Sequence, residues 1–112
     1  MRGAGVVIEQ DAGCTRVRLA GEVDGSTRGL SAAALARVVA RGVSVELDLA
    51  AVRFLDSAGV ALLLRCLRTC TEAGLACTVT AVSEPAARVL RLLGLAGVLG
   101  MPAEGGVTAA GA

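Results

Sequence analysis

The chain of 112 residues is the size of one domain, which can bury about two-thirds of its unfolded surface without disulfides or a structural metal. Its net charge of +1 comes from 11 basic and 10 acidic residues with no run of either sign, which argues against a nucleic-acid partner. The absence of histidine excludes Ser–His and Cys–His nucleophile pairs and imidazole metal ligands, so we expect neither an enzyme nor a cofactor.

Two strands are predicted at the start of the chain. Residues 6–10, VVIEQ, precede a DAG turn at residues 11–13. Residues 14–19, CTRVRL, then alternate apolar and basic side chains, which is typical of a strand with one face in water. The short turn between them predicts a hairpin.

A helix is predicted next. Leu30, Ala34 and Val38 recur every four residues, after Ser26–Thr27, which can cap a helix, and before Arg41–Gly42, which can close one.

Two further segments have the alternation of strands. They are residues 43–49, VSVELDL, and residues 76–81, ACTVTA. We expect the first strand to end near Leu49 and the stretch AAVRFL, residues 50–55, to carry the chain across to the next helix. One polar face on each strand predicts helices on one side of the sheet.

The remaining segments have helical spacing. One helix is expected to begin after Asp56 and end at Gly74, and another to span residues 84–94 with Pro85 in its first turn. The predicted core stripe of the first consists of Val60, Leu63, Leu64 and Leu67.

Together these elements predict an α/β fold, an open mixed β-sheet of four to five strands with helices packed mainly on one face, in the order β-β-α-β-α-β-α. The fifth strand would be a short one near Val98 to Met101. We expect residues 1–102 to form the domain and residues 103–112, which have little large apolar surface, to form a flexible tail.

The four cysteines lack CxxC spacing, and no apolar run reaches the ~18 residues of a membrane span. We therefore expect a cytoplasmic protein without membrane insertion, whose cysteines act mainly as small buried apolar residues. Cys66 and Cys70, four residues apart, share one flank of a helix, which leaves metal or redox chemistry open, although two ligands do not make a zinc site.

Asp56 and Ser57 stand where the third strand gives way to the helix that follows. Either side chain can accept hydrogen bonds from the first free N–H groups of that helix, which would make the pair a structural cap. A helix start also stabilises anions, so a phosphoryl group on Ser57 would be tolerated there.

These motifs resemble the STAS family, and in particular its single-domain anti-sigma factor antagonists. The resemblance covers residues 5–101 and is carried by "LDLAAVRFLDSAGVALLLRCLRTCTEAGL", by "LAGEVDGST" upstream and by "VSEPAARVLRLLGL" downstream. It implies that Ser57 is phosphorylated by an anti-sigma factor that is also a serine kinase, and that a serine phosphatase removes the phosphate. The unphosphorylated protein would bind that anti-sigma factor and release the sigma factor.

The resemblance also implies a partner surface. Asp24 and Asp56 would lie beside Ser57, and Gly59 would permit close approach of the partner. Independently, Leu62 and Cys66 widen the apolar arc of the helix beyond its core stripe, which predicts either a partner-binding flank or coverage by the helix of residues 84–94. An alternative function is a STAS interaction subunit of a lipid or anion transport system, or of a signalling scaffold, in which Ser57 is only a cap.

Overall fold

The computed structural model describes residues 5–11, 13–24 and 32–101, which form an α/β fold with an open mixed sheet of four strands. The elements are β1 (Gly5–Gln10), β2 (Cys14–Val23), α1 (Ala32–Ala40), β3 (Ser44–Leu55), α2 (Ser57–Glu72), β4 (Cys77–Val82) and α3 (Glu84–Leu92). The predicted fold class and order of elements are confirmed. Leu30, the expected cap at Ser26–Thr27 and the expected tail at 103–112 lie outside the described residues.

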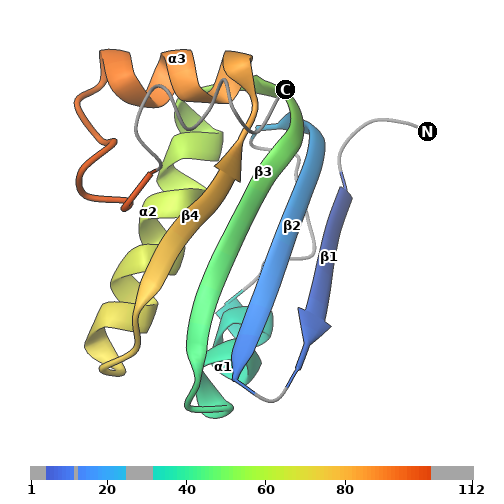
Figure 1. Cartoon of the computed structure of the whole chain (residues 1–112), viewed down its shortest axis with the longest axis vertical. Coiled ribbons are helices and arrows are strands. Elements are labelled where there is room, and N and C mark those ends of the chain that lie inside the picture. The colour runs from blue at the N-terminus through green and yellow to red at the C-terminus, as the bar shows by residue number, and fades with distance from the viewer. Residues whose placement is uncertain (1–4, 12, 25–31, 102–112) are drawn as a thin grey trace.

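The sheet has the strand order β1-β2-β3-β4. β1 and β2 are antiparallel, as the predicted hairpin requires, whereas β3 is parallel to both β2 and β4. Figure 1 shows α1 and α2 behind the sheet, and α3 across the end at which β3 and β4 finish. Within the described ranges no helix covers the other face, the open face of the sheet (Figure 1).

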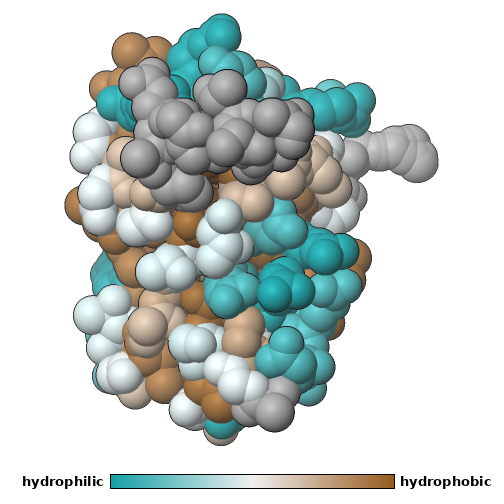
Figure 2. Space-filling model, in the orientation of Figure 1, coloured by the Kyte–Doolittle hydropathy of each residue, from teal (hydrophilic) through white to brown (hydrophobic). Residues whose placement is uncertain are grey.

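The alternation of the strands sorts side chains between these two faces. The helix-covered face is aliphatic and includes the fully buried residues Val17, Leu19, Val45, Leu47 and Leu49. On the open face, Arg16 pairs with Glu46 at 3.1 Å and Arg18 with Asp48 at 3.3 Å, and both arginines also reach Glu9. Figure 2 shows these hydrophilic residues gathered over the middle of β1, β2 and β3.

The prediction for the end of β3 was wrong. The strand does not stop near Leu49 but continues through Leu55, and β2 likewise extends to Val23. Two register shifts against β2 each insert an extra residue into β3, so that Val52 and Leu55 still point into the core. These bulges break the strict alternation that marks a strand in the sequence.

The C-terminal part of the described chain also differs from expectation. α3 ends at Leu92, and residues 96–100 form turns instead of a fifth strand. One strand-like bond is present, from the Val79 N–H to the Leu99 carbonyl at 2.9 Å, and Leu99 itself is buried. None of the helices in the described ranges is long and apolar enough to cross a membrane.

Candidate functional site

The candidate site lies at the edge of the sheet where β2 and β3 end. Both strands run in the same direction, and Val23 at the end of β2 pairs with Leu55 at the end of β3. Asp24 and Asp56 directly follow these two residues, and the Asp56 N–H donates to the Val23 carbonyl at 3.4 Å. The topology therefore brings Asp24, from the GEVD segment, next to Asp56 and Ser57.

Asp56, and not Ser57, is the cap of α2. Its backbone is extended, with φ −106° and ψ −174°, and its Oδ1 accepts a hydrogen bond from the Gly59 N–H at 2.9 Å. Ser57 is the first helical residue and is exposed to solvent. The sequence left open which of the two residues is the cap and which is free for chemistry. Asp56 accepts the hydrogen bond from the free N–H group at the helix start, and Ser57 faces the solvent.

Gly59 fixes how closely α2 approaches β2. It is buried, and a Cβ atom at this position would lie 2.2 Å from the Val23 carbonyl oxygen and 2.7 Å from Leu55 Cδ1. A side chain cannot fit there without moving the backbone of β2. Gly59 therefore permits the close approach of α2 to the end of β2, and this contact holds Asp24 beside the start of α2.

The electrostatics of this edge suit a reversible negative charge. The free N–H groups of the first turn of α2 give the helix start a partial positive charge, which stabilises anions there. Ser57 is exposed at that start, and the side chain of the preceding Asp56 caps the helix beside it. A phosphoryl group would thus be tolerated by the helix and would make the outer surface strongly negative.

Leu62 and Cys66 do not form the partner-binding flank that was one of the two alternatives left open by the sequence. Leu62 is 8% exposed and Cys66 fully buried. The buried face of α2 is rotated relative to the predicted core stripe, because Gly59 must face the end of β2. As a result Leu64 and Leu67, which the sequence placed in the core, are only half-buried. In this structure neither Leu62 nor Cys66 is accessible to a partner.

Cys66 belongs to a group of three buried thiols with Cys70 and Cys77. Burial raises the pKa of Cys70 to about 12, and hydrogen bonding with Cys66 together with burial raises the pKa of Cys77 as well. The thiols of Cys70 and Cys77 are therefore protonated at neutral pH and are poor nucleophiles. The spacing of Cys66 and Cys70 indicated two members of this group, but only the fold could add Cys77.

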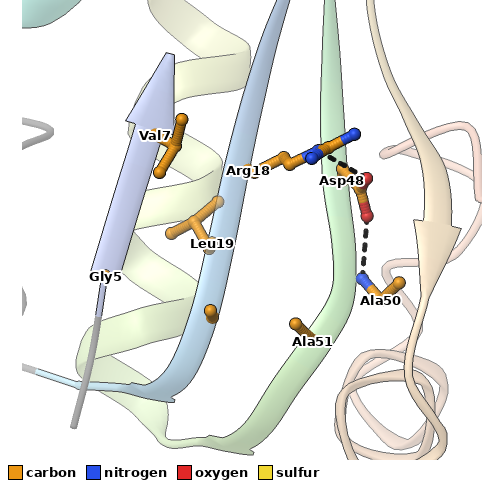
Figure 3. Close-up of a pocket in the computed structure, with 8 residues that line it drawn as sticks. Gly5, Val7, Arg18, Leu19, Asp48, Ala50 and Ala51 are labelled. Carbon is orange, nitrogen blue, oxygen red and sulfur yellow. Dashed lines mark hydrogen bonds and ion pairs between the residues drawn. The ribbon is translucent and has the colours of Figure 1, made fainter. Parts of the chain in front are cut away.

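A second surface feature lies on the open face of the sheet, which the sequence did not indicate. It is an apolar hollow of about 260 Å³, bordered by the Arg18–Asp48 ion pair. Figure 3 shows the residues that line it. Its apolar lining consists of Gly5, Val7, Leu19, Ala20, Ala50 and Ala51. Its polar atoms are already used, since Asp48 also accepts from the Ala50 N–H at 3.0 Å. The mostly apolar lining gives the hollow the character of a contact surface.

Comparisons with known proteins agree with this geometry. The crystal structure of an anti-sigma factor antagonist from Mycobacterium paratuberculosis is similar to this chain with a TM-score of 0.74 and 25% identity, over 96% of this chain and 93% of that one. The structure of the anti-sigma factor antagonist SpoIIAA in its unphosphorylated form has the same fold, with a TM-score of 0.57, 21% identity, and coverage of 81% and 82%. No curated protein sequence matches.

The family comparison covers almost the entire described chain. Residues 6–101 match the family model described as "Mlab, STAS domain". This range includes the hairpin, all three described helices and the edge that carries Asp24, Asp56 and Ser57. The chain therefore belongs to the STAS domain family.

Proposed function

We propose that this protein is an anti-sigma factor antagonist controlled by phosphorylation of Ser57. The observation that carries the proposal is the exposed Ser57 at the first position of α2, beside the capping Asp56 and next to Asp24. The likeness to a solved antagonist over nearly the full length of both chains supports it. In its unphosphorylated form the protein binds an anti-sigma factor that is also a serine kinase, and the sigma factor is released.

Phosphorylation would act through charge at the contact surface. A phosphoryl group adds a charge of about −1.5 to −2 at neutral pH. At Ser57 the helix start tolerates this charge within the protein, but a partner that buries the edge must desolvate it beside the carboxylates of Asp24 and Asp56. The fold stays the same while the complex is weakened.

The protein is the substrate of this chemistry and its partner is the catalyst. The chain contains no histidine to activate Ser57, and the buried thiols of Cys70 and Cys77 are kept protonated. A serine hydroxyl is a weak nucleophile without a base, so the kinase must bring the base as well as ATP. A serine phosphatase then restores the binding form.

The test is incubation of the protein with its cognate serine-kinase anti-sigma factor and ATP, followed by peptide mass spectrometry. We expect one phosphate on Ser57, none on Ser57→Ala, and an unchanged phosphate on Ser83→Ala. Ser83 is the matched control because it also stands at a helix start, where it caps α3. Absence of phosphate on the wild type, or its persistence on Ser57→Ala, would contradict the proposal.

A second candidate is an interaction subunit of a lipid or anion transport system or of a signalling scaffold. The apolar hollow on the open face favours it, together with the exposed side chains of Val7 and Phe54 nearby on β1 and β3. A partner bound there would not contact Ser57. Under this function Val7→Asp would abolish partner binding and Ser57→Asp would leave it intact, whereas the antagonist function predicts the reverse.

A further inference from the structure

Three thiols from two elements meet inside the core, away from the edge that carries Ser57. The Sγ atoms of Cys66, Cys70 and Cys77 all lie within 4.8 Å of one another. Cys66 and Cys70 are one turn apart on α2, and Cys77 is the first residue of β4. None of them is in a disulfide. The crossover from α2 to the parallel strand β4 thus completes a group of which the sequence spacing indicated only two members.

The spacing of the sulfur atoms suits one shared ion. A metal–sulfur bond is about 2.3 Å long in zinc sites, so three sulfurs that share one ion are at most about 4.0 Å apart, with the ion in their plane. The sulfur atoms of Cys66, Cys70 and Cys77 lie within 4.8 Å of one another, so the largest separation must shrink by up to about 0.8 Å to meet this limit. A small thiophilic ion at the centre of Cys66, Cys70 and Cys77 could therefore bond to all of them.

The apolar surroundings select the charge of that ion. Cys66 and Cys70 are fully buried, Cys77 is 8% exposed, and within the described ranges no carboxylate joins the cluster. Three thiolates carry three negative charges, so a monovalent or divalent ion leaves a net charge in the core, which is unfavourable. A trivalent centre leaves none. Zinc would in addition lack the fourth ligand that its tetrahedral geometry requires.

We propose that Cys66, Cys70 and Cys77 form a binding site for a trivalent thiophilic metalloid, for which arsenite is the probe. Uncharged arsenous acid condenses with the three thiols. Three S–H bonds and three As–O bonds break, three As–S bonds form, and the hydrogens and hydroxyl groups leave as three water molecules. No atom changes its oxidation state, so the reaction needs no oxidant or reductant.

The site has a route of entry at the end of α2. Cys77 is the most exposed of the three thiols and directly follows a loop in which Ala73, Gly74 and Ala76 are exposed. Opening of this loop would admit a small neutral molecule. Once bound, the ion would link α2 to β4 covalently and would stabilise the folded state, because it binds the unfolded chain less well.

The test is a titration of the full-length protein with arsenite in a thiol-free phosphine reductant, followed by native mass spectrometry and thermal unfolding. We expect one adduct, heavier by one arsenic atom less three hydrogen atoms, and a higher unfolding temperature. Cys14→Ala is the matched control because Cys14 lies on β2, outside the cluster, and it should behave as wild type. Cys66→Ala and Cys77→Ala should each lose more than about tenfold in affinity.

X-ray absorption at the arsenic edge needs no variant and counts the sulfur neighbours directly. Three sulfur atoms around arsenic in the wild-type protein would support the site, and fewer would overturn it. Tighter binding of zinc than of arsenite would overturn the assignment to a trivalent ion. An adduct that persists in Cys66→Ala and disappears in Cys14→Ala would overturn the assignment to this cluster.

Discussion

The two ends of α2 hold nucleophilic side chains in opposite environments. At the start, Ser57 is exposed beside Asp56, where free N–H groups stabilise negative charge. Toward the other end, Cys66 and Cys70 are buried against Cys77, and burial raises the pKa of the Cys70 thiol. The serine is the weaker nucleophile by nature, yet it is the one that a partner enzyme can reach.

Under the proposed function, accessibility and local charge, and not intrinsic reactivity, decide which residue is modified. A kinase would supply the base that Ser57 lacks, whereas the thiols enclosed in the core can react only with a small molecule that enters it. Changes at the two ends of the helix should therefore have separable effects. Stability should respond to the buried contacts, and partner binding should respond to Ser57.

Among the substitutions on the side of α2 that faces the sheet edge, the largest loss of stability is expected from Gly59→Ala. The added Cβ would lie 2.2 Å from the Val23 carbonyl oxygen, so we expect a loss of about 1–3 kcal/mol in the free energy of unfolding, measured with urea. In an open helix position the same change stabilises by about 1 kcal/mol. Gly13→Ala is the control, because a Cβ there meets nothing within 4 Å. Wild-type stability of Gly59→Ala would contradict the packing described for this edge.

The buried thiols predict a loss of stability in alkali. The pKa of Cys70 rises from 9.0 to about 12 on burial, so between these values the unfolded chain loses a proton that the folded chain keeps. Stability should be complete below pH 9 and should fall as the pH rises, by about 1.4 kcal/mol per pH unit for each such proton.

This alkaline effect can be assigned with unusual clarity, because every basic residue of the chain is arginine and tyrosine is absent. Lysine and tyrosine side chains therefore do not titrate in the same range. Urea unfolding at a series of pH values should give a shallower slope for Cys70→Ala than for the wild type. Equal slopes would show that Cys70 is not the group that loses the proton.

A smaller effect is expected from Asp56→Ala. This change removes the side-chain oxygen that accepts from the Gly59 N–H and should cost about 1 kcal/mol in the free energy of unfolding. Asp56→Asn keeps an acceptor oxygen and should retain most of that stability. If both variants lose the same amount, the hydrogen bond is not what Asp56 contributes.

The smallest effect on stability is expected from Ser57→Ala. Ser57 is exposed and does not cap the helix, so the free energy of unfolding should change by less than about 0.5 kcal/mol. Thermal and urea unfolding both measure it. A loss larger than that of Asp56→Ala would mean that Ser57 has a structural role, which would weaken its assignment as a switch.

The sequence was informative wherever one residue pattern repeated. The alternating strands, the hairpin and the start of α2 after Asp56 all follow from local periodicity and capping, and the structure has them. The second half of β3 was missed because its bulges replace alternation with a spacing that resembles a loop. The apolar hollow was missed for the same reason, because its lining residues Ala50 and Ala51 lie at the first bulge.

Other features depend on contacts between distant segments, which no local pattern encodes. The buried face of α2 is set by Gly59 against Val23, and this contact places Leu62 and Cys66 in the core. The proximity of Asp24 to Asp56 needs the parallel pairing of β2 with β3. The pattern of residues alone does not predict that Asp24 lies near Asp56, and only the family resemblance implied it.

The most direct test of the central claim is the affinity of the protein for its serine-kinase anti-sigma factor with and without a phosphate on Ser57. Isothermal titration calorimetry would measure both forms, and circular dichroism would compare their folds. We predict binding weaker by at least about tenfold, or 1.4 kcal/mol, for the phosphorylated form, with identical spectra. Equal affinities of the two forms would contradict the account of Ser57 as the switch.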